Sequence, residues 1–398
     1  MIIFWIILII AALVFLIVLD YQLGKKYHEK KDTLKKYPLR SGDITIFTGG
    51  DDLFPSYFSD IENAHSSIHI LFFIVKDDAI SHKFFELLEK KARAGVDVRL
   101  LLDWIGGHHV SKNCIKSLKR AGVQVIFSHR LKFPFTFYSL QQRNHRKITV
   151  IDEEVGYIGG FNIGKEYLNQ NPSLSPWRDY HLRISGDSVH DLQYEFSINW
   201  YEESGHQLDL ATPELQSESG NVKHQFLSTG GTDLEKMIGD WIDQAHSDIK
   251  IGTPYFIPTE NIHRKLIAAI KRGVRITVLV PKKPDHMLVK EASFCYFRDL
   301  LRHGVNIYQY STGFYHAKII VIDHKLCMIG TANFDRRSFL LNDEISCLIY
   351  DETFIKKALT IFTYDLQHGN LLTKEDLYHL DLVTKVKEWS ARAVSNFL

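Results

Sequence analysis

The sequence predicts an α/β protein made of two similar halves, preceded by one N-terminal membrane-spanning helix. Two observations indicate the halves: strand-like and helix-like segments alternate twice in the same order, and short motifs recur at a nearly constant spacing within the 398 residues. A third observation indicates the membrane helix, because the first 19 residues carry no charged side chain. Hydrophobic residues make up 45% and charged residues 24%, which is typical of a folded chain.

The apolar N-terminal segment is long enough to cross a bilayer. At about 1.5 Å per residue it spans roughly 28 Å, close to the roughly 30 Å hydrocarbon core. A cleaved signal peptide is the alternative, but no Lys or Arg precedes the apolar run and no A-x-A-like site follows it. We therefore expect residues 1–20 to form an uncleaved, single-pass transmembrane anchor.

Residues 21–40 are predicted to form a basic juxtamembrane segment. The positive side chains of this segment are Lys25, Lys26, Lys30, Lys31, Lys35, Lys36 and Arg40. Because basic flanks stay on the cytoplasmic side of a membrane, we expect the long C-terminal part of the chain to lie in the cytoplasm. The same lysines can hold anionic lipid headgroups near the surface.

Internal repeats divide the rest of the chain. Residues 48–53 (TGGDDL) recur as residues 229–234 (TGGTDL), and 229 − 48 = 181. The segment AHSSI at 64–68 recurs at the same offset as AHSDI at 245–249. We therefore predict a first half over residues 41–204, a polar linker over 205–225, a second half over 226–370 and an amphipathic C-terminal tail over 371–398.

Strand-like and helix-like segments follow the same order in each half. In the first half, the sequence predicts strands at 68–75, 96–102 and 123–127, with helices at 84–94 and 115–121 between them. In the second half, the matching strands are predicted at 249–256, 274–280 and 305–310, and the helices at 266–272 and 294–303. Since this alternation is typical of parallel strands joined by helices, we expect a largely parallel sheet covered on both faces.

A third repeated block carries chemically active side chains. Its first copy consists of His145, Lys147, Asp152, Gly159, Gly160 and Asn162, and its second of His316, Lys318, Asp323, Gly330, Thr331 and Asn333. All six positions share one offset, 316 − 145 = 171. A single His-x-Lys is usually an ordinary surface hairpin, whereas two copies with six matched positions indicate a functional site.

Each copy of the block predicts a β-hairpin with its aspartate at the turn. Two runs rich in β-branched residues flank Asp152 and Asp323, and these positions suit a turn. The His and Lys of each copy are two residues apart, so both side chains face the same side of the strand. The glycines that end the hairpins are expected to let backbone approach a ligand closely.

Two imidazoles, two ammonium groups and two carboxamides in one pocket suit a phosphate. One histidine can attack phosphorus, and the other can protonate the leaving alkoxide and later deprotonate the incoming hydroxyl. The lysines and asparagines would stabilise charge on the phosphate oxygens. We expect neither a metal nor another cofactor, since the lysines supply positive charge and no carboxylate cluster has metal-ligand spacing. The four cysteines are interpreted as buried, reduced thiols.

This pattern resembles the phospholipase D superfamily, named for its H-K-D motif, and within it the bacterial cardiolipin synthases. The supporting residues are WRDYHLR at 177–183, TPYFIP at 253–258, NFDRRSF at 333–339, Asn342 and Glu344. The resemblance covers residues 40–370. It implies two phospholipase D-like halves in a pseudo-twofold arrangement, with the site at their interface. It also implies transfer of a phosphatidyl group from one phosphatidylglycerol to another at the bacterial cell membrane, with release of glycerol.

The resemblance further implies roles for individual residues. Asp152 and Asp323 are expected to hold the hairpins rather than contact phosphate. A nucleophilic histidine needs an acceptor that fixes its tautomer, and Asp179 and Glu344 are the candidates; the alternative is that they are surface carboxylates or salt-bridge partners. The resemblance favours His145 as the nucleophile. Family members often carry two N-terminal membrane segments, whereas this sequence shows one.

Other functions remain to be weighed. A hydrolytic phospholipase D, or a transferase using another alcohol, would share the chemistry and differ only in the acceptor. The net charge of +1 and the membrane anchor argue against a nuclease, and an inactive lipid-binding scaffold would have lost motif residues that are all present. We therefore expect membrane phospholipids as partners, no nucleic acid and no obligatory protein partner, because one chain supplies both histidines.

Two segments outside the motifs invite a lipid-related interpretation. The first half has about 11 extra residues between Gly122 and His145, within residues 127–142, where aromatic and basic side chains alternate. This loop either guides lipid to the site or covers the core. The tail spaces Leu382, Val386, Trp389 and Ala393 as on one helix face. It either lies on the membrane or packs against the protein.

Overall fold

The computed structural model describes residues 1–28, 34–210, 220–231, 233–378 and 381–394. Lys30 and Lys31 of the basic segment, residues 211–219 of the expected linker and the last four residues of the tail lie outside the described residues.

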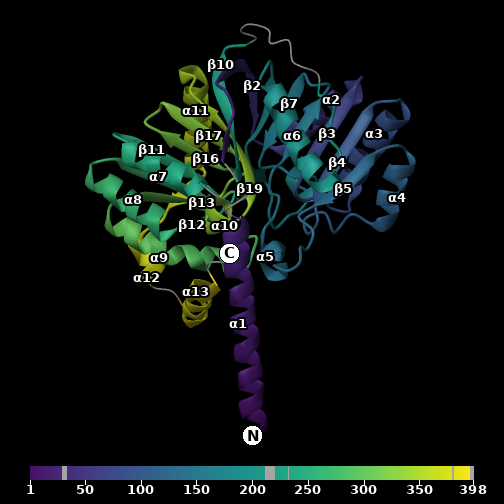
Figure 1. Ribbon diagram of the computed structural model, residues 1–398. Helices are drawn as coiled ribbons and strands as arrows, with labels where there is room; N and C mark the ends of the chain where they lie inside the picture. Colours follow the sequence, from purple (N-terminus) through teal and green to yellow (C-terminus); the bar gives the residue numbers. More distant parts are fainter. Residues whose placement is uncertain (29–33, 211–219, 232, 379–380, 395–398) are drawn as a thin grey trace.

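Helix α1 (Ile2–His28) extends away from the rest of the protein (Figure 1). Among the described residues it is the one helix long and apolar enough to cross a membrane, and its apolar side chains are exposed. The helix continues eight residues beyond the expected anchor, so the first part of the basic segment is helical. Its last turn carries Lys25, Lys26 and His28.

The remaining elements form two halves with matching order. The first half contains β1 (Lys35–Lys36), β2 (Arg40–Phe47), α2 (Gly50–Asn63), β3 (Ser67–Phe72), α3 (Ala79–Arg93), β4 (Asp97–Asp103), α4 (Lys112–Arg120), β5 (Gln124–Ser128), α5 (Thr136–Gln141), β6 (Ile148–Ile151), β7 (Val155–Gly159), the 3-10 helix η1 (Lys165–Leu168), β8 (Trp177–Arg178), β9 (His181–Ser185) and α6 (Val189–Ser204).

The second half begins with β10 inside the expected linker. It contains β10 (Val222–Gly230), α7 (Leu234–Gln244), β11 (Asp248–Gly252), β12 (Phe256–Ile257), α8 (Glu260–Lys271), β13 (Arg275–Pro281), α9 (Val289–Arg302), β14 (Asn306–Tyr310), β15 (Phe314–Tyr315), β16 (Ile319–Ile322), β17 (Leu326–Gly330), β18 (Phe334–Asp335), α10 (Arg336–Leu340), β19 (Asp343–Ile349), α11 (Glu352–Gln367) and β20 (Gly369–Leu371). The tail forms α12 (Lys374–Tyr378) and α13 (Leu382–Val394).

Matching helices begin and end by the same local chemistry. The Asp78 side chain accepts a hydrogen bond from the Ser81 N–H at the start of α3, and Thr259 caps α8 in the same way. Beyond their last turns lie Gly95 and Gly273, with φ of +92° and +93°, a conformation that glycine adopts without steric cost.

One 16-stranded sheet runs through both halves. Outward from the central pair β10 and β2, the order is β19, β17, β16, β11, β13 and β14 on one side, and β9, β7, β6, β3, β4 and β5 on the other. The two halves are therefore related by a pseudo-twofold axis between β10 and β2, as the two-half fold class predicts.

The prediction of a largely parallel sheet is wrong. Only β3–β4–β5 and β11–β13–β14 pair in parallel within this sheet, and its other pairings are antiparallel. The reason is the hairpin in each motif, β6–β7 and β16–β17, whose strands must run antiparallel and which pairs antiparallel with β3 or β11.

A continuous apolar core joins the halves. Phe196 and Trp200 of α6 and Phe354 and Phe362 of α11 belong to one buried cluster together with residues of β6, β9, β16 and β19. Because the cluster contains residues of both halves, the two motifs are held at a fixed distance from one another.

The 127–142 segment and the tail both contact other elements. Helix α5 packs against the end of α1: the Tyr138 N–H donates to Asp20 at 2.8 Å, and the rings of Tyr21 and Phe137 lie 6.4 Å apart. In the tail, α13 buries Ala391 beside α9 and leaves Leu382, Val386 and Trp389 exposed. The α13 helix thus packs on the protein while presenting an apolar stripe.

Candidate active site

The two histidines enter the site from opposite halves, and each backbone is held by the other half. The His145 N–H donates to the Asp343 carbonyl at 2.9 Å, and the His316 N–H donates to the Arg178 carbonyl at 2.7 Å. Both residues lie just before the first strand of their hairpins, β6 and β16. The site therefore exists only where the halves meet.

Each histidine is paired with a carboxylate of the other half. Nδ1 of His145 lies 2.9 and 3.1 Å from the two oxygens of Glu344, and Nδ1 of His316 lies 2.5 Å from Oδ2 of Asp179. Asp179 and Glu344 occupy matching places, each two residues before the residue that pairs with Gly159 or Gly330. The sequence analysis predicted both carboxylates as partners of the histidines, but not that each would contact the histidine of the other half. We call these two contacts the crossed pairs.

The histidines are neutral at neutral pH. Burial lowers the pKa of each imidazole to about 4, although Glu344 and Asp179 oppose the shift. Burial also acts to raise the pKa of Asp179 and Glu344. The adjacent Lys318 and the hydrogen bond with His316 lower the pKa of Asp179 overall, and the contacts with His145 and Lys147 lower that of Glu344, so both groups stay ionised. An ionised carboxylate can only accept, so Nδ1 carries the proton and Nε2 presents a lone pair.

The two motif lysines are buried beside the histidines. Lys147 Nζ donates to the His145 carbonyl at 2.8 Å, and Lys318 Nζ lies 3.4 Å from Asp179 Oδ2 and 2.6 Å from Nδ1 of His316. Burial lowers the pKa of Lys147 to about 7, and it lowers the pKa of Lys318 as well. An anion in the pocket would favour their charged forms.

The motif aspartates brace the hairpins away from the pocket. Asp152 accepts hydrogen bonds from the N–H groups of His65, Ser66 and Ser67 at 2.7 to 2.9 Å. Asp323 accepts the equivalent bonds from residues 246–248. Each carboxylate therefore fixes its hairpin turn to the start of a neighbouring strand.

Replacing Asp323 by asparagine is expected to lower the free energy of unfolding at pH 7 by about 1–3 kcal/mol, because an amide N–H₂ would face backbone donors. Burial acts to raise the pKa of Asp323, but the donors at residues 246–248 lower it to about 2 overall. The stabilisation is therefore complete above the usual value of 3.8 and is lost as the pH falls through about 2.

Urea titrations in detergent should show this difference at pH 7 and a smaller one near pH 2, with Asp240→Asn on the exposed face of α7 as the control. Equal stability of the Asp323 variant and the control at pH 7 would contradict the bracing role.

The motif glycines make room for protein rather than for a ligand, which corrects their expected role. A Cβ on Gly159 would lie 2.5 Å from the His181 Cα, and one on Gly330 would lie 2.3 Å from the Ile345 carbonyl oxygen. A Cβ on Gly160 would lie 2.0 Å from the Asp179 carboxylate. At the matching position, Thr331 donates its hydroxyl hydrogen to Glu344 at 2.5 Å.

The two motif asparagines differ in their surroundings. Asn162 accepts from the Ile74 N–H at 3.0 Å and donates to the Tyr167 hydroxyl at 3.1 Å, so its carboxamide serves the protein. The side-chain oxygen of Asn333 is buried and has no hydrogen-bond partner among the described residues. Both residues line the pocket. The two asparagines were expected to bind phosphate oxygens in the same way, but their contacts differ.

A cavity of about 520 Å³ opens between the two histidines. Phe73 packs edge-on against His145 with ring centres 4.9 Å apart, and its ring lies 5.2 Å from Lys147 Nζ. The Trp177 ring lies 4.8 Å from that of His316. Further lining residues that the sequence did not assign to the site include Arg143, Arg337, Tyr255 and Asp285. Arg143 and Arg337 could have been found from their positions beside the motifs.

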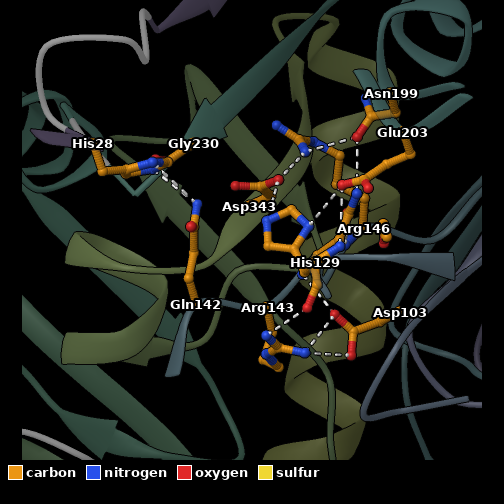
Figure 2. Close-up of polar contacts among 12 residues, drawn as sticks. His28, Asp103, His129, Gln142, Arg143, Arg146, Asn199, Glu203, Gly230 and Asp343 are labelled. Atoms are coloured by element: carbon orange, nitrogen blue, oxygen red, sulfur yellow. Dashed lines mark hydrogen bonds and ion pairs between the residues drawn. The ribbon is translucent and has the colours of Figure 1, made fainter. Parts of the chain in front are cut away.

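Buried ion pairs surround the residues next to His145 and Glu344 in the chain, namely Arg143, Arg146 and Asp343 (Figure 2). Asp343, next to Glu344, lies 2.9 Å from Arg146 and 3.2 Å from His129. Arg143 pairs with Asp103 at 3.2 Å. His28, at the end of α1, lies beside Gly230 and Gln142 in the same view. Its Nε2 is 2.7 Å from the Gly230 carbonyl oxygen and 2.9 Å from the Gln142 amide nitrogen. Helix α1 is thus tied to the residues that lead into the first motif.

Within the described ranges, no three histidine, cysteine, aspartate and glutamate side chains are grouped as metal ligands would be. Among the described residues, the cationic side chains placed to hold a phosphate are Lys147 and Lys318 beside the histidines and Lys76, Arg143 and Arg337 in the cavity wall.

A family model and sequence relatives both indicate the cardiolipin synthases. A family model described as cardiolipin synthase, PLD-like domain, matches residues 57–174 and 238–366. The minor cardiolipin synthase of Bacillus subtilis (strain 168) is 42% identical over 398 residues, covering 100% of both chains. The major cardiolipin synthase of the same organism is 38% identical over 364 residues, covering 89% of this chain and 75% of that protein.

Among solved structures, a phosphatidylserine synthase from Haemophilus influenzae Rd KW20 superposes with a TM-score of 0.73. The match covers 94% of this chain and 100% of that one at 16% identity, which is evidence about the fold alone.

Proposed function

The chain belongs to the cardiolipin synthase family of the phospholipase D superfamily, and from this premise we propose that it joins two phosphatidylglycerol molecules into cardiolipin and glycerol. It is a phosphatidyltransferase with phospholipid substrates. The observation that carries the proposed reaction is the pair of crossed histidine–carboxylate contacts in one cavity. Two imidazoles with fixed tautomers supply a nucleophile and a proton carrier on opposite sides of a phosphate.

In the first step, Nε2 of His145 attacks the phosphorus of the donor lipid. The bond from phosphorus to the glycerol headgroup breaks, and His316 gives its proton to the departing alkoxide. Lys147 and Lys318 stabilise the charge on the phosphate oxygens. The bound anion and Asp179 raise the pKa of His316, so that this imidazole can carry the proton while substrate is present.

In the second step, the terminal glycerol hydroxyl of the acceptor phosphatidylglycerol loses its proton to His316. Its oxygen attacks the phosphatidyl-histidine, the phosphorus–nitrogen bond breaks, and His145 is restored. Water in place of the acceptor would give phosphatidic acid through the same steps, so the acceptor distinguishes a synthase from a hydrolase.

The assignment of His145 as nucleophile rests on the family. Glu344 also accepts hydrogen bonds from Thr331 at 2.5 Å and Ser338 at 2.8 Å. Asp179 likewise accepts from the Tyr180 N–H at 2.7 Å and lies 3.4 Å from Lys318 Nζ, so the two carboxylates do not by themselves distinguish the histidines.

Trapping the intermediate tests this proposal. The protein is mixed with phosphatidylglycerol labelled in its phosphate, denatured in detergent at neutral pH, and digested. We expect label on the peptide that contains His145, and none in the His145→Ala variant. Label on the His316 peptide would reverse the two roles, and no covalent label in any rapid quench would contradict the covalent mechanism.

We further propose that the anchor at residues 1–20 crosses the membrane once and that both halves lie in the cytoplasm. Support comes from the basic side chains Lys25, Lys26, Lys35, Lys36 and Arg40, which follow the apolar run. A single cysteine placed on the exposed face of α4 in a cysteine-free variant should resist a membrane-impermeant reagent until the membrane is opened. Labelling of intact cells would overturn this orientation.

A further inference from the structure

A second cavity lies between the membrane helix and α10. It has a volume of about 780 Å³, within the usual range for ligand sites. One wall is the face of α1 from Ile17 to Lys26, and the opposite wall is formed by Arg336, Leu340 and Leu341. Phe137, at α5, completes the groove, and Figure 1 shows α10 and α5 beside the upper end of α1.

The groove follows the polarity of a phospholipid along the helix axis. Ile17 and Val18 lie toward the apolar end of α1, while Lys25 and Lys26 lie toward the catalytic part. Arg336 adds a third positive charge, and no acidic side chain is among the lining residues. An apolar channel that ends in basic groups matches acyl chains joined to an anionic headgroup.

Helix α10 lies between the groove and the catalytic cavity. Arg336 lines the groove and the adjacent Arg337 lines the cavity that holds both histidines. Arg337 donates to the Gln141 carbonyl at 2.7 Å, which ties α10 to α5 across the end of α1. A lipid in the groove would therefore present its headgroup at the Arg337 side of the histidines.

The chemistry requires two lipid paths, because the first phosphatidyl group stays attached to histidine while the second lipid enters. The phosphate of the acceptor does not react and keeps its negative charge, so it needs cationic partners other than the motif lysines. Arg143 and Arg337 both line the catalytic cavity, and the buried Nε of Arg143 has no hydrogen-bond partner among the described residues. Arg337 belongs to α10, the helix that also forms the wall of the groove. Asp285, an acidic side chain of the cavity wall, is hydrogen-bonded to Tyr255, whose hydroxyl donates to it at 2.6 Å.

We propose that the groove between α1 and α10 is the binding site of the acceptor phospholipid, with acyl chains between the helices and phosphate near Arg143 and Arg337. This assignment rests on the proposed function. The acceptor hydroxyl gives its proton to His316, its oxygen forms the new bond to phosphorus, and the bond from phosphorus to His145 breaks. The groove takes part in this second step and not in the first.

Filling the groove separates the two steps. The full chain is reconstituted in phosphatidylglycerol vesicles, either as Ile17→Trp/Val18→Trp from one wall or as Leu340→Trp from the other. Leu16→Trp is the matched control, because Leu16 is 57% exposed, Ile17 is 42% exposed, and Leu16 is not among the lining residues. Incorporation of radiolabelled glycerol into phosphatidylglycerol reports the first step and its reversal, since free glycerol needs no acyl groove.

Cardiolipin formation should fall by about tenfold or more in both groove variants, because the acceptor hydroxyl is misplaced. Glycerol exchange should stay within about twofold of the rate in the wild type and the control. A damaged fold would reduce exchange as well as synthesis. Parallel loss of exchange and synthesis, or no loss of either, would overturn the acceptor assignment. Absence of both activities in the wild-type chain would overturn the proposed function and the acceptor site with it.

Discussion

Replacing His145 or His316 by alanine is expected to reduce phosphatidylglycerol turnover by about 10⁴-fold or more. The His145 variant loses the nucleophile, and the His316 variant loses the proton carrier for both steps. Because the two imidazoles act on one phosphate as a unit, the double variant should be little worse than either single one. This non-additivity separates a shared site from two independent sites.

Initial rates in phosphatidylglycerol vesicles give the measurement. His65→Ala is a suitable control, because His65 lies on the surface and only its backbone N–H contacts Asp152. Half of the wild-type activity remaining in either histidine variant would show that each motif works alone and would contradict the shared site.

The second large effect is expected at the crossed carboxylates. Replacing Asp179 by asparagine or Glu344 by glutamine keeps the shape of the side chain but removes the charge that fixes the Nδ1 proton. Activity should fall by about 10²- to 10⁴-fold, the range found when such an acceptor is lost. Both side chains are almost fully buried, with 0% and 1% exposed, so solvent cannot replace them.

Because each carboxylate contacts the histidine of the other half, each variant should affect one particular histidine. A general loss of structure would affect both histidines alike. Nitrogen chemical shifts of a labelled protein should show a changed His145 tautomer in Glu344→Gln and a changed His316 tautomer in Asp179→Asn. Thermal unfolding of the variants provides the stability control. If each variant instead perturbed the histidine of its own half, the crossed pairing would be contradicted.

Local patterns were enough to predict the ten strands and helices of the two parallel units. Their apolar runs and helix-ending glycines are set by neighbouring residues, so the expected segments and the observed elements agree apart from their ends. The remaining strands were harder. Strand β3 pairs with β4 on one side and with β6 on the other, and such pairings join residues far apart in the sequence. The antiparallel hairpins therefore made the sheet mixed rather than largely parallel.

The site shows the same division. Spacing located His145, Lys147 and their second copies, because these residues are close in sequence and their repetition is visible. The contact of His145 with Glu344 joins residues 199 positions apart, and no local pattern encodes it. The glycines were misassigned for a related reason: a missing side chain marks a close approach but does not say whether protein or ligand approaches.

The 127–142 segment illustrates a third case. Its aromatic and basic composition pointed to lipid, but the sequence could not say which element would face it. In the structure it contacts α1, and Gln142 meets His28 at the end of that helix. The position of helix α1 relative to the catalytic cavity therefore depends on this insertion.

Product analysis with the full chain, in vesicles whose only lipid is radiolabelled phosphatidylglycerol, tests whether the two histidines transfer a phosphatidyl group between lipids. The two-histidine transfer mechanism predicts cardiolipin and free glycerol in equal amounts, with neither product formed by His145→Ala or His316→Ala. Phosphatidic acid without cardiolipin would contradict the transferase and identify a hydrolase built on the same pair of histidines.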